Sequence, residues 1–581
     1  MSDKIRRDRI GQRRLRNAGT ALAICATLSA TALSAQTASQ ITPESFQPEL
    51  RRLNGSVEFT GQTGTQAPPG ADAIGITLSG VDLKDGLPQL AQANAAYRAR
   101  LTRGRIPVSE LFEATADLEA AYANEGFILS RVVLPQQSLR DGGRLQVVVV
   151  KGFIEDVDTS NVSDNTRARI EALTERLLND PELTQAELER QLLLAGDVPG
   201  TALRSALGAG AKPGAAVIAL DPEYRPVTGF LGFGNPSSSQ LGTVNLNLGI
   251  ELNSTLKFGE TLYGRLSGAP NDFFSSTPQS RIIALGAVVP LGVSGLTLNV
   301  EATKSDTTPD NPAAPTRSKF ERQSVRLAYP FIRSRQTNLS GQVVLDRQED
   351  TQQFLGGAAP VTVFRDKITV LRFGGNLTYI HDDESVTDAG FILSRGINAL
   401  GATTAAEAAA AGSALSRQNS DATFTKIAGS FSHRRALSNT FALSVTGRAQ
   451  SSFGDALVTA EQFSIVGAQE LSPFDAGSLR GDAGWVVRAE MSTVRQTRIG
   501  QIPVLLSPYA FLGAGSVSLE SPTATEQRRI NAYAYGVGMD IFTQTDSNFR
   551  STSVRLELGR GERDDTQPDE SRFSITGNMR F

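Results

Sequence analysis

Hydrophobic and polar residues alternate along most of the chain from about residue 223 to residue 581. Every second residue is apolar over residues 244–252, and the same alternation returns at 296–301 and 554–558. Successive side chains of a β-strand point to opposite faces, so these segments are predicted to be strands with one apolar and one polar face. Clusters of Gly, Asn, Asp, Ser and Pro separate the segments and predict turns, as at 267–272 and 307–312.

The length of this region decides between the folds that contain such strands. A β-sandwich uses about 100 residues, and the alternating region is several times longer without an internal linker. At roughly 22 residues per strand and loop, its 360 or so residues would form about 16 strands, within the range of membrane β-barrels. In such a barrel the apolar faces contact lipid and the polar faces line the lumen. Stacked sandwiches and a β-propeller are the soluble alternatives, although no blade-like repeat of about 40 residues is visible.

The last residues of the chain continue the alternation down to a terminal aromatic residue. In a closed barrel the last strand must pair with the first, because any unpaired edge would expose backbone groups to lipid. The pattern therefore predicts a barrel-closing strand with four apolar residues on its outer face: Phe573, Ile575, Met579 and Phe581.

Before the barrel, residues 73–222 carry helical periodicity mixed with short apolar runs, which predicts two small α/β units over 73–154 and 155–222. In the first unit, strands are expected at 74–78, 127–134 and 145–150, and helices at 87–101 and 108–125. In the second, a strand begins near Phe153, helices run over 165–178 and from Thr184, and two strands close the unit. Each unit thus has the element order β-α-α-β-β.

The first 72 residues contain two further segments. Residues 1–35 have the order of a secretory signal peptide: a basic stretch, an apolar stretch, and small residues suited to cleavage. Residues 36–72 combine a helix candidate at 44–53, interrupted by Pro48, with a Gly-, Pro- and Gln-rich linker. The single cysteine, Cys25, lies inside the signal, so the exported chain would contain no disulfide, zinc-thiolate site or cysteine nucleophile.

Charge and motifs exclude several functions. The formal net charge of -3 argues against a basic nucleic-acid binder. The chain has no HExxH, G-x-S-x-G or Walker A motif, and its two histidines, His381 and His433, are far apart in sequence. The acidic clusters at 382–384 and 562–570 are interpreted as solvated barrel loops rather than Ca²⁺ sites. We therefore expect no enzymatic activity, catalytic residue, cofactor or metal.

Several sequence stretches resemble one known family. Residues 126–137, Asp141-Gly142 and 147–152 are similar to the first periplasmic POTRA domain of two-partner-secretion transporters, the haemolysin secretion/activation proteins of the ShlB/FhaC/HecB type. Residues 395–401 with 424–426, and 463–469 running through Gly481–Trp485 to Arg488, resemble barrel segments of the same family. The likeness covers nearly the whole exported chain.

The resemblance implies a membrane β-barrel of about 16 antiparallel strands in the bacterial outer membrane, preceded by two α/β POTRA domains in the periplasm. It implies that the protein captures an unfolded exoprotein carrying an N-terminal secretion domain and exports it through the barrel, whose pore the 44–53 helix would plug. Outer-membrane lipid and, during biogenesis, the barrel-assembly machinery would be its other partners; no nucleic acid is expected. The exoprotein would dock as an added strand near these POTRA residues: Phe127, Leu129, Arg131, Val133, Pro135 and Gln136.

The family also implies a long loop that folds into the barrel, and here the chain departs from the family pattern. The loop includes Ser472, Pro473, Phe474, Gly481, Asp482 and Trp485, and the strand facing it includes Phe511, Gly513 and Gly515. Ser472 stands where the family has an Arg, and Gly513 where it has the partner Asp. Losing both charges avoids an unpaired buried charge. We expect the loop to fold inward still, anchored by Pro473 and Phe474 instead.

Three other functions stay open. A passive diffusion porin would not need the POTRA-like units. A barrel-assembly factor of the same superfamily usually carries more than two such units or retains the Arg in the loop. A soluble adhesin or interaction protein is disfavoured by the terminal Phe581.

Overall fold

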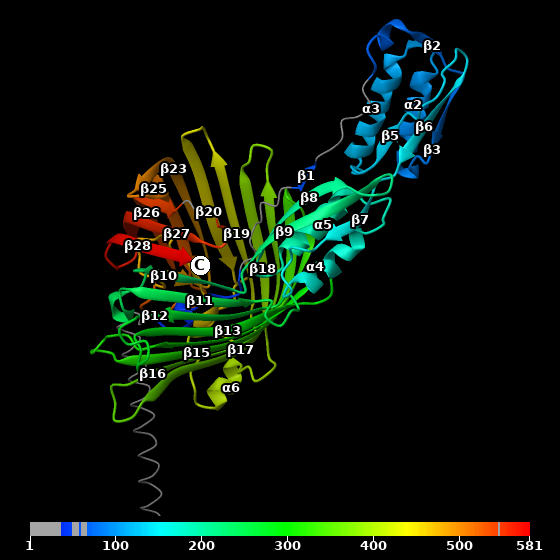
Figure 1. The fold of residues 1–581 in the computed structure, drawn as a ribbon. Helices are drawn as coiled ribbons and strands as arrows, with labels where there is room; N and C mark the ends of the chain where they lie inside the picture. The colour runs from blue at the N-terminus through cyan, green and yellow to red at the C-terminus, as the bar shows by residue number, and fades with distance from the viewer. Residues whose placement is uncertain (1–35, 49–56, 60–66, 544–546) are drawn as a thin grey trace, which may run out of the picture.

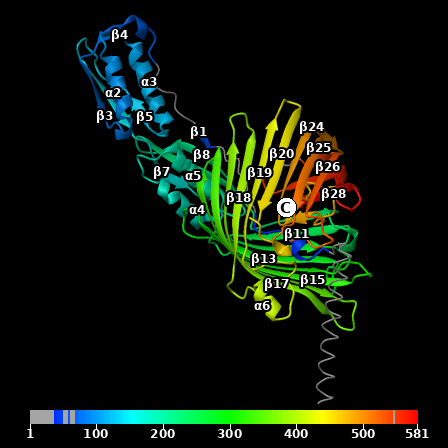
Figure 2. The same cartoon turned by 180° about the vertical axis from the view of Figure 1, so that it is seen from behind.

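The computed structural model describes residues 36–48, 57–59, 67–543 and 547–581 of the chain (Figures 1 and 2). Two small α/β units extend from one end of a large β-barrel, and the first unit lies farther from the barrel than the second (Figure 1). The predicted signal peptide, residues 1–35, lies outside the described residues. Within the described residues, no helix is both long and apolar enough to span a membrane.

The first unit packs two helices against a small sheet of strand order β3-β6-β5. The helix α3 buries Leu111, Leu118 and Tyr122 on one face, as its periodicity predicts, and Thr115 on that face shares a 2.9 Å hydrogen bond with the hydroxyl of Tyr97. The elements are β2 (Gly75–Thr77), β3 (Gly80–Lys84), η3 (Pro88–Leu90), α2 (Ala91–Leu101), β4 (Arg105–Pro107), α3 (Ser109–Asn124), β5 (Arg131–Val133) and β6 (Arg144–Val150).

The strand predicted at 127–134 is wrong in its first half, because only Arg131–Val133 is a strand. The backbone N–H of Phe127 donates to the carbonyl of Tyr122 (2.9 Å), and that of Ser130 donates to the carbonyl of Phe127 (3.1 Å). These residues therefore end the helix and form a turn. Ile128 and Leu129 in this turn pack against the core of the second unit, which joins the two units.

The second unit has a four-stranded sheet of order β1-β8-β9-β7, covered by two helices. Strand β1 comes from the segment that precedes the first unit and pairs in parallel with the edge of β8. The hydroxyl of Thr184 accepts a hydrogen bond from the N–H of Glu187 and caps α5, as its position before the helix predicts. The elements are β1 (Val57–Phe59), β7 (Phe153–Asp158), α4 (Arg167–Thr174), η4 (Glu175–Leu177), α5 (Gln185–Gly196), β8 (Thr201–Ala209) and β9 (Ala215–Tyr224).

The barrel is closed and antiparallel, and its described residues form 16 strands. Seventeen segments are labelled, but β23 and β24 both pair with β25 and are two halves of one strand. The segments are β10 (Val227–Gly234), β11 (Asn245–Asn253), β12 (Thr261–Gly268), β13 (Ser280–Pro290), β14 (Thr297–Thr307), β15 (Thr316–Arg333), β16 (Thr337–Phe354), β17 (Val361–Ile380), β18 (Val386–Ile397), β19 (Thr425–Ala436), β20 (Phe441–Ser451), β23 (Ala483–Thr493), β24 (Arg495–Ile499), β25 (Ile502–Ser518), β26 (Arg529–Thr543), β27 (Ser551–Arg563) and β28 (Glu570–Arg580).

The barrel is polar inside and apolar outside, as the alternation predicts. On β14, Asn299, Glu301 and Thr303 are at most 4% exposed, whereas Val300 between them is 48% exposed. A water-soluble protein would show the opposite arrangement. This pattern is what a barrel surrounded by lipid requires, since lipid contacts the outer face.

The last strand closes the barrel, which confirms the predicted fold class. Strand β28 pairs antiparallel with β10 from Phe230↔Arg580 to Gly234↔Thr576. Beyond these pairs, Gly229 and Phe581 exchange two backbone hydrogen bonds of 2.9 and 3.0 Å. The apolar side chains of Phe573, Met579 and Phe581 are exposed on the outer face.

The two rims of the barrel differ. Short turns join the strands at the rim next to the α/β units, which we call the near rim. Longer loops lie at the far rim, where both views show the helix α6 (Ala405–Ala410) at the end opposite the α/β units (Figures 1 and 2). Residues 452–482, which connect β20 to β23, form one of these longer loops.

Candidate functional site: the plugged lumen and its inward loop

Residues 36–48, which we call the plug segment, lie inside the barrel. The backbone N–H of Ala38 donates to the hydroxyl of Ser318 (3.1 Å), and the hydroxyl of Ser39 donates to Asp350 (2.5 Å). The hydroxyls of Thr42 and Ser305 are 2.6 Å apart. These wall residues are buried on strands β14, β15 and β16. The lumen is therefore occupied by the chain's own N-terminal region.

The plug segment is not the helix predicted at 44–53. Its only helical turn is η1 (Ser39–Ile41), residues 44–48 form neither helix nor strand, and residues 49–53 lie outside the described part of the chain. The wall offers charged side chains to the backbone groups that a helix would use internally. The N–H of Phe46, for example, donates to Glu301 (2.9 Å).

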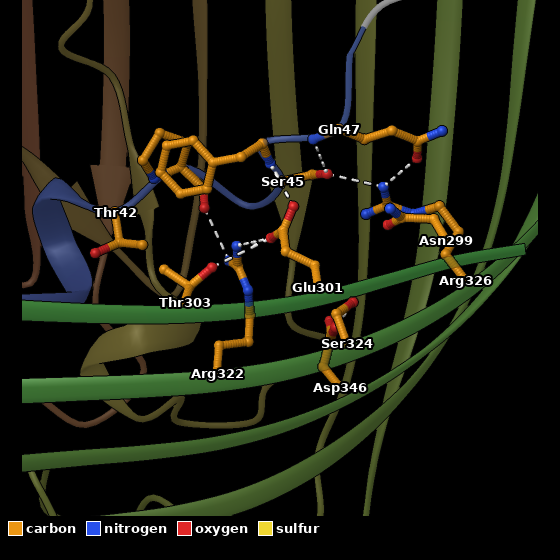
Figure 3. A network of polar contacts seen from close by, with 12 residues as sticks. Thr42, Ser45, Gln47, Asn299, Glu301, Thr303, Arg322, Ser324, Arg326 and Asp346 are labelled. Carbon is orange, nitrogen blue, oxygen red and sulfur yellow. Dashed lines mark hydrogen bonds and ion pairs between the residues drawn. The ribbon is translucent and has the colours of Figure 1, made fainter. Parts of the chain in front are cut away.

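Three charged wall residues hold the second half of the plug segment (Figure 3). Arg322 donates from Nη1 to the carbonyl of Pro43 (2.8 Å) and from Nη2 to Oε1 of Glu301 (2.9 Å). Arg326 donates from Nη1 to the side chains of Ser45 (2.8 Å) and Gln47 (2.7 Å). In Figure 3 the side chains of Glu301, Arg322 and Arg326 rise from the strands toward the plug segment, which crosses above them.

A second buried ionic cluster fixes the loop of residues 452–482 at the far rim against the barrel wall. Glu461, in the short turn η6 (Thr459–Glu461), pairs with Arg372 (2.6 Å) and Lys426 (2.8 Å), and Arg372 also pairs with Asp346 (2.7 Å). Two positive and two negative groups balance each other, which buried charges require. The turn η6 contacts η1, so this loop also helps to confine the plug segment.

Residues 463–482, which we call the inward loop, pack inside the barrel. Two short strands, β21 (Phe463–Ser464) and β22 (Arg480–Gly481), pair at the base of the loop. Between them, Leu471 and Phe474 are at most 1% exposed and belong to a hydrophobic cluster with wall residues of β23, β25 and β26. The structure thus places this loop as the family resemblance implies.

Ser472 anchors the inward loop to an ion pair that belongs to the wall. Arg488 on β23 donates to Glu557 on β27 (2.5 Å), and its guanidinium lies 3.6 Å from the ring centroid of Phe511. The hydroxyl of Ser472 accepts from Arg488 (2.8 Å) and donates to Glu557. Tyr509 also donates to Glu557 (2.7 Å). Positions 472 and 513 carry no charge, but an Arg–carboxylate pair is present between Arg488 and Glu557.

The residues proposed as hydrophobic anchors contact the wall closely. A Cβ added at Gly561 would lie 2.6 Å from Cζ of Phe474, and one added at Gly559 would lie 2.8 Å from Cγ of Pro473. The next residue, Asp475, pairs with Arg572 of the closing strand. The loop is thus held by packing at Pro473 and Phe474 and by ionic contacts on both sides of them.

The predicted facing strand does face the inward loop. Phe511 is buried beneath Arg488, a Cβ added at Gly513 would lie 2.9 Å from Leu471, and one added at Gly515 would lie 3.1 Å from Ile465. Glycine at 513 and 515 therefore lets the loop approach the wall backbone. A carboxylate at 513 would have to displace Leu471.

The remaining predicted loop residues have different positions. Asp482 is buried at the end of the loop and accepts from the backbone N–H groups of Leu457 (3.1 Å) and Glu520 (2.8 Å). Gly481 lies against the backbone of Ser518. The prediction that Trp485 belongs to the inward loop is wrong. Trp485 lies on β23 and is 46% exposed on the outer face, because its neighbour Val486 takes the inward position.

The predicted docking residues of the first unit do not form one surface. Phe127 is buried in the core, Leu129 packs at the joint between the units, and Arg131 pairs with Glu119 (3.5 Å). Val133 and Gln136 are exposed and Pro135 is half-buried. Among the described residues β5 pairs only with β6, so its other edge carries no strand, and the backbone N–H of Val132 donates to the carboxylate of Glu119 (3.0 Å).

The second unit docks on the near rim through one bidentate ion pair. Arg333 at the end of β15 donates to both oxygens of Asp197 (2.8 and 2.6 Å), just after α5. Burial raises the pKa of the Asp197 carboxyl, and the hydrogen bonds and charge of Arg333 oppose that shift. Arg190 of α5 adds hydrogen bonds to the carbonyls of Ser294 (3.1 Å) and Pro330 (3.0 Å).

The structure brings the two histidines together at the near rim. Their rings are 5.8 Å apart, and the hydroxyl of Thr387 contacts both His381 (2.8 Å) and His433 (2.9 Å). In the described part of the chain, no group of three or more His, Cys, Asp or Glu side chains could hold a metal ion.

These features define a class of protein: a closed 16-stranded barrel with two POTRA-type units and a plugged lumen. The family model of the haemolysin secretion/activation proteins ShlB/FhaC/HecB matches residues 214–541, more than half of the chain, and the ShlB-type POTRA domain matches residues 77–152. The chain belongs to this family.

Individual relatives are distant in sequence. The chain is 23% identical over 159 residues to the heme/hemopexin transporter protein HuxB of Haemophilus influenzae (strain 86-028NP), covering 27% of this chain and 28% of HuxB. It is 24% identical over 234 residues to the outer membrane transporter CdiB of Escherichia coli O6:K15:H31 (strain 536 / UPEC), covering 40% of this chain and 39% of CdiB. The aligned regions thus span well under half of these relatives.

Solved structures share the fold over nearly the whole length. CdiB from Escherichia coli superposes with a TM-score of 0.70 at 20% identity, covering 92% of this chain and 94% of that chain. CdiB from Acinetobacter baumannii gives a TM-score of 0.61 at 16% identity, covering 91% and 95%.

Several residues of the site could not be identified from the sequence. Glu301, Arg322 and Arg326 are three charges among many on alternating strands, and only the position of the plug segment distinguishes them. Arg488 belongs to a family-like stretch, but its partner Glu557 is 69 residues away. The signal that could have found such residues is a charge at a lumen-facing position of a strand, since an unpaired charge there is costly.

Proposed function

We propose that this protein is an outer-membrane translocator that captures an unfolded exoprotein with its POTRA domains and exports it through the barrel. Family membership supports the transport class, and the relatives HuxB and CdiB are named as transporters. The POTRA domains would lie in the periplasm, and the apolar outer face of the barrel would contact outer-membrane lipid. The barrel-assembly machinery would insert the barrel during biogenesis.

One observation carries the proposal: the polar lumen is filled by the plug segment and the inward loop. The inward loop is held partly by apolar packing against the wall, but the plug segment is held by hydrogen bonds to buried wall residues. Such contacts can be exchanged for contacts to another polypeptide without exposing much apolar surface. A passive diffusion porin would instead need a lumen open to small solutes.

Capture of the exoprotein is proposed at the outer edge of β5, where an incoming strand would replace Glu119 as the acceptor for the N–H of Val132. An exposed strand edge binds an extended peptide through main-chain hydrogen bonds, and neighbouring side chains provide selectivity. Val133 and Gln136 are exposed near this edge and Pro135 is half-buried, whereas Phe127, Leu129 and Arg131 support the fold behind it. The docking site would therefore be the second half of the stretch predicted from the sequence.

Deletion of the gene tests the proposal. The cell should lose one large exoprotein from its surface or medium, and a plasmid copy of the gene should restore it. The abundance of other outer-membrane barrels is the control, because a barrel-assembly factor would lower many of them. An unchanged set of exported proteins would contradict the proposal.

A further inference from the structure

Half of the wall contacts to residues 43–47 of the plug segment are to main-chain groups, which every polypeptide has. The carbonyl of Pro43 accepts from Arg322 (2.8 Å), and the N–H of Phe46 donates to Glu301 (2.9 Å). The other two contacts, both from Arg326, are to the uncharged side chains of Ser45 and Gln47. The wall thus contacts one acceptor and one donor of the main chain, three residues apart.

The wall side of these contacts is built independently of the plug segment. Glu301 also accepts from Tyr263 (2.9 Å), Thr303 (3.2 Å) and Arg322 (2.9 Å). Both Glu301 and Arg322 are 4% exposed. Wall residues alone therefore fix their orientation, and a second chain would find the same donor and acceptor in place.

The same wall residues have hydrogen-bonding capacity that the plug segment does not use. The buried Nε atoms of Arg322 and Arg326 have no hydrogen-bond partner among the described residues, and neither does Oδ1 of the neighbouring Asn299. Buried polar atoms are normally paired. The unpaired atoms indicate that this part of the wall can accept a ligand other than residues 43–47.

We propose that Glu301, Arg322 and Arg326, which we call the wall patch, bind the main chain of the polypeptide in transit, and that residues 43–47 occupy this site when no polypeptide is present. The inference rests on the proposed function and names the groups in the lumen that contact the exported chain. A translocator must accept side chains of many kinds, yet every extended chain offers the same carbonyl and N–H groups. Charged partners strengthen hydrogen bonds to such groups.

The test uses two synthetic peptides as probes: residues 36–48 of this chain, and a scrambled peptide of the same composition. The channel is the chain lacking residues 36–48, reconstituted in planar bilayers. The four hydrophobic clusters of the fold contain none of these residues, so the barrel should form, and heat-modifiable migration on gels checks that it has. Block of the ionic current by each peptide is measured over a range of concentrations.

If the wall patch binds main chain, both peptides block the current at similar concentrations. Glu301→Gln should weaken the block by both peptides about tenfold, the size expected for one hydrogen bond to a charged group. Ala302→Gln, at the next and outward-facing position, is the matched control and should change nothing. Block by the native-order peptide alone would overturn the proposal, and so would block by neither peptide.

A second measurement leaves the protein unchanged, in case Glu301→Gln disturbs the wall. Methylating the backbone nitrogen of Phe46 in the native-order peptide removes the donor to Glu301 and should weaken its block about tenfold. Methylation at the exposed Glu44 is the control. Equal block by the two methylated peptides would contradict main-chain binding. These results do not depend on export in cells, so they are separate from the deletion test of the proposed function.

Discussion

Arg488 joins the inward loop to the barrel wall. It is 1% exposed and contacts Glu557, Ser472 and the ring of Phe511 together. The sequence has Ser472 and Gly513 where the family resemblance implies a loop Arg and its strand Asp. It could not show that an Arg from one strand and a Glu from another supply the pair, because that contact depends on how the barrel closes around the loop.

Arg488→Ala should be strongly destabilising. Glu557 would keep its buried position without its ionic partner, and breaking such a pair costs about 3–5 kcal/mol. Ser472→Ala removes only the hydroxyl between the two charges and should cost about 1.5–3 kcal/mol. Unfolding in urea, followed by heat-modifiable migration, measures both. If the two variants were equally stable, the stabilisation would come from the contacts of Ser472 in the inward loop and not from the Arg488–Glu557 ion pair.

Gly561→Ala should displace the inward loop without changing any charge. Its added Cβ would lie 2.6 Å from Phe474, so this ring must move. Gly447→Ala is the matched control, since its added Cβ would make only ordinary contacts at 3.4 Å. A cysteine introduced at Ser472 reports the displacement through its rate of alkylation, and no other cysteine is present after residue 25. We expect faster alkylation with Gly561→Ala only; equal rates would show that Phe474 does not hold the loop.

At the scale of elements, the sequence predicted the strands well and the plug poorly. The strands could be predicted because every one of them has lipid on its outer side and the polar lumen on its inner side. Apolar and polar residues therefore alternate along it, as at Val300 and Glu301. The 44–53 helix was predicted from local spacing, but Glu301 and Arg322 bind backbone groups of the segment directly. The strand at 127–134 was predicted too long, because Ile128 and Leu129 pack against the core of the second unit instead of extending the sheet. Local patterns cannot reveal partners that come from distant parts of the chain.

Arg333→Ala should loosen the joint between the second POTRA unit and the barrel. Asp197 would remain buried without Arg333, so nothing would oppose the rise in its pKa that burial causes. A carboxyl whose pKa is raised in the docked state favours docking at low pH and loses that contribution as the pH rises through this pKa. Docking of the variant should therefore strengthen as the pH is lowered.

Distances between spin labels on α5 and on the near-rim turn at 334–336 measure this docking. Asp197→Asn combined with Arg333→Ala is the control, because it removes the titrating group and should abolish the pH dependence. If Arg333→Ala alone gives distances that do not change with pH, Asp197 does not titrate at this joint.

At the scale of the whole molecule, the chain combines two POTRA units, a closed barrel and an N-terminal segment that fills the lumen. The two POTRA units, the closed barrel and the inward loop could be anticipated from composition, alternation and resemblance. The state of the pore could not, because occupancy of the lumen depends on contacts between residues 36–48 and strands about 260 to 310 residues away. The central claim is that the route of the exported protein runs through the lumen that the plug segment now fills.

A reversible lock on the plug segment tests this claim most directly. The hydroxyls of Thr42 and Ser305 are 2.6 Å apart, so cysteines at both positions should form a disulfide that holds the segment in the lumen. We predict that export of the exoprotein falls to the level of the deletion strain when the disulfide is formed and recovers when it is reduced, while each single cysteine variant exports normally. Normal export through protein whose disulfide is shown to be intact would contradict the account.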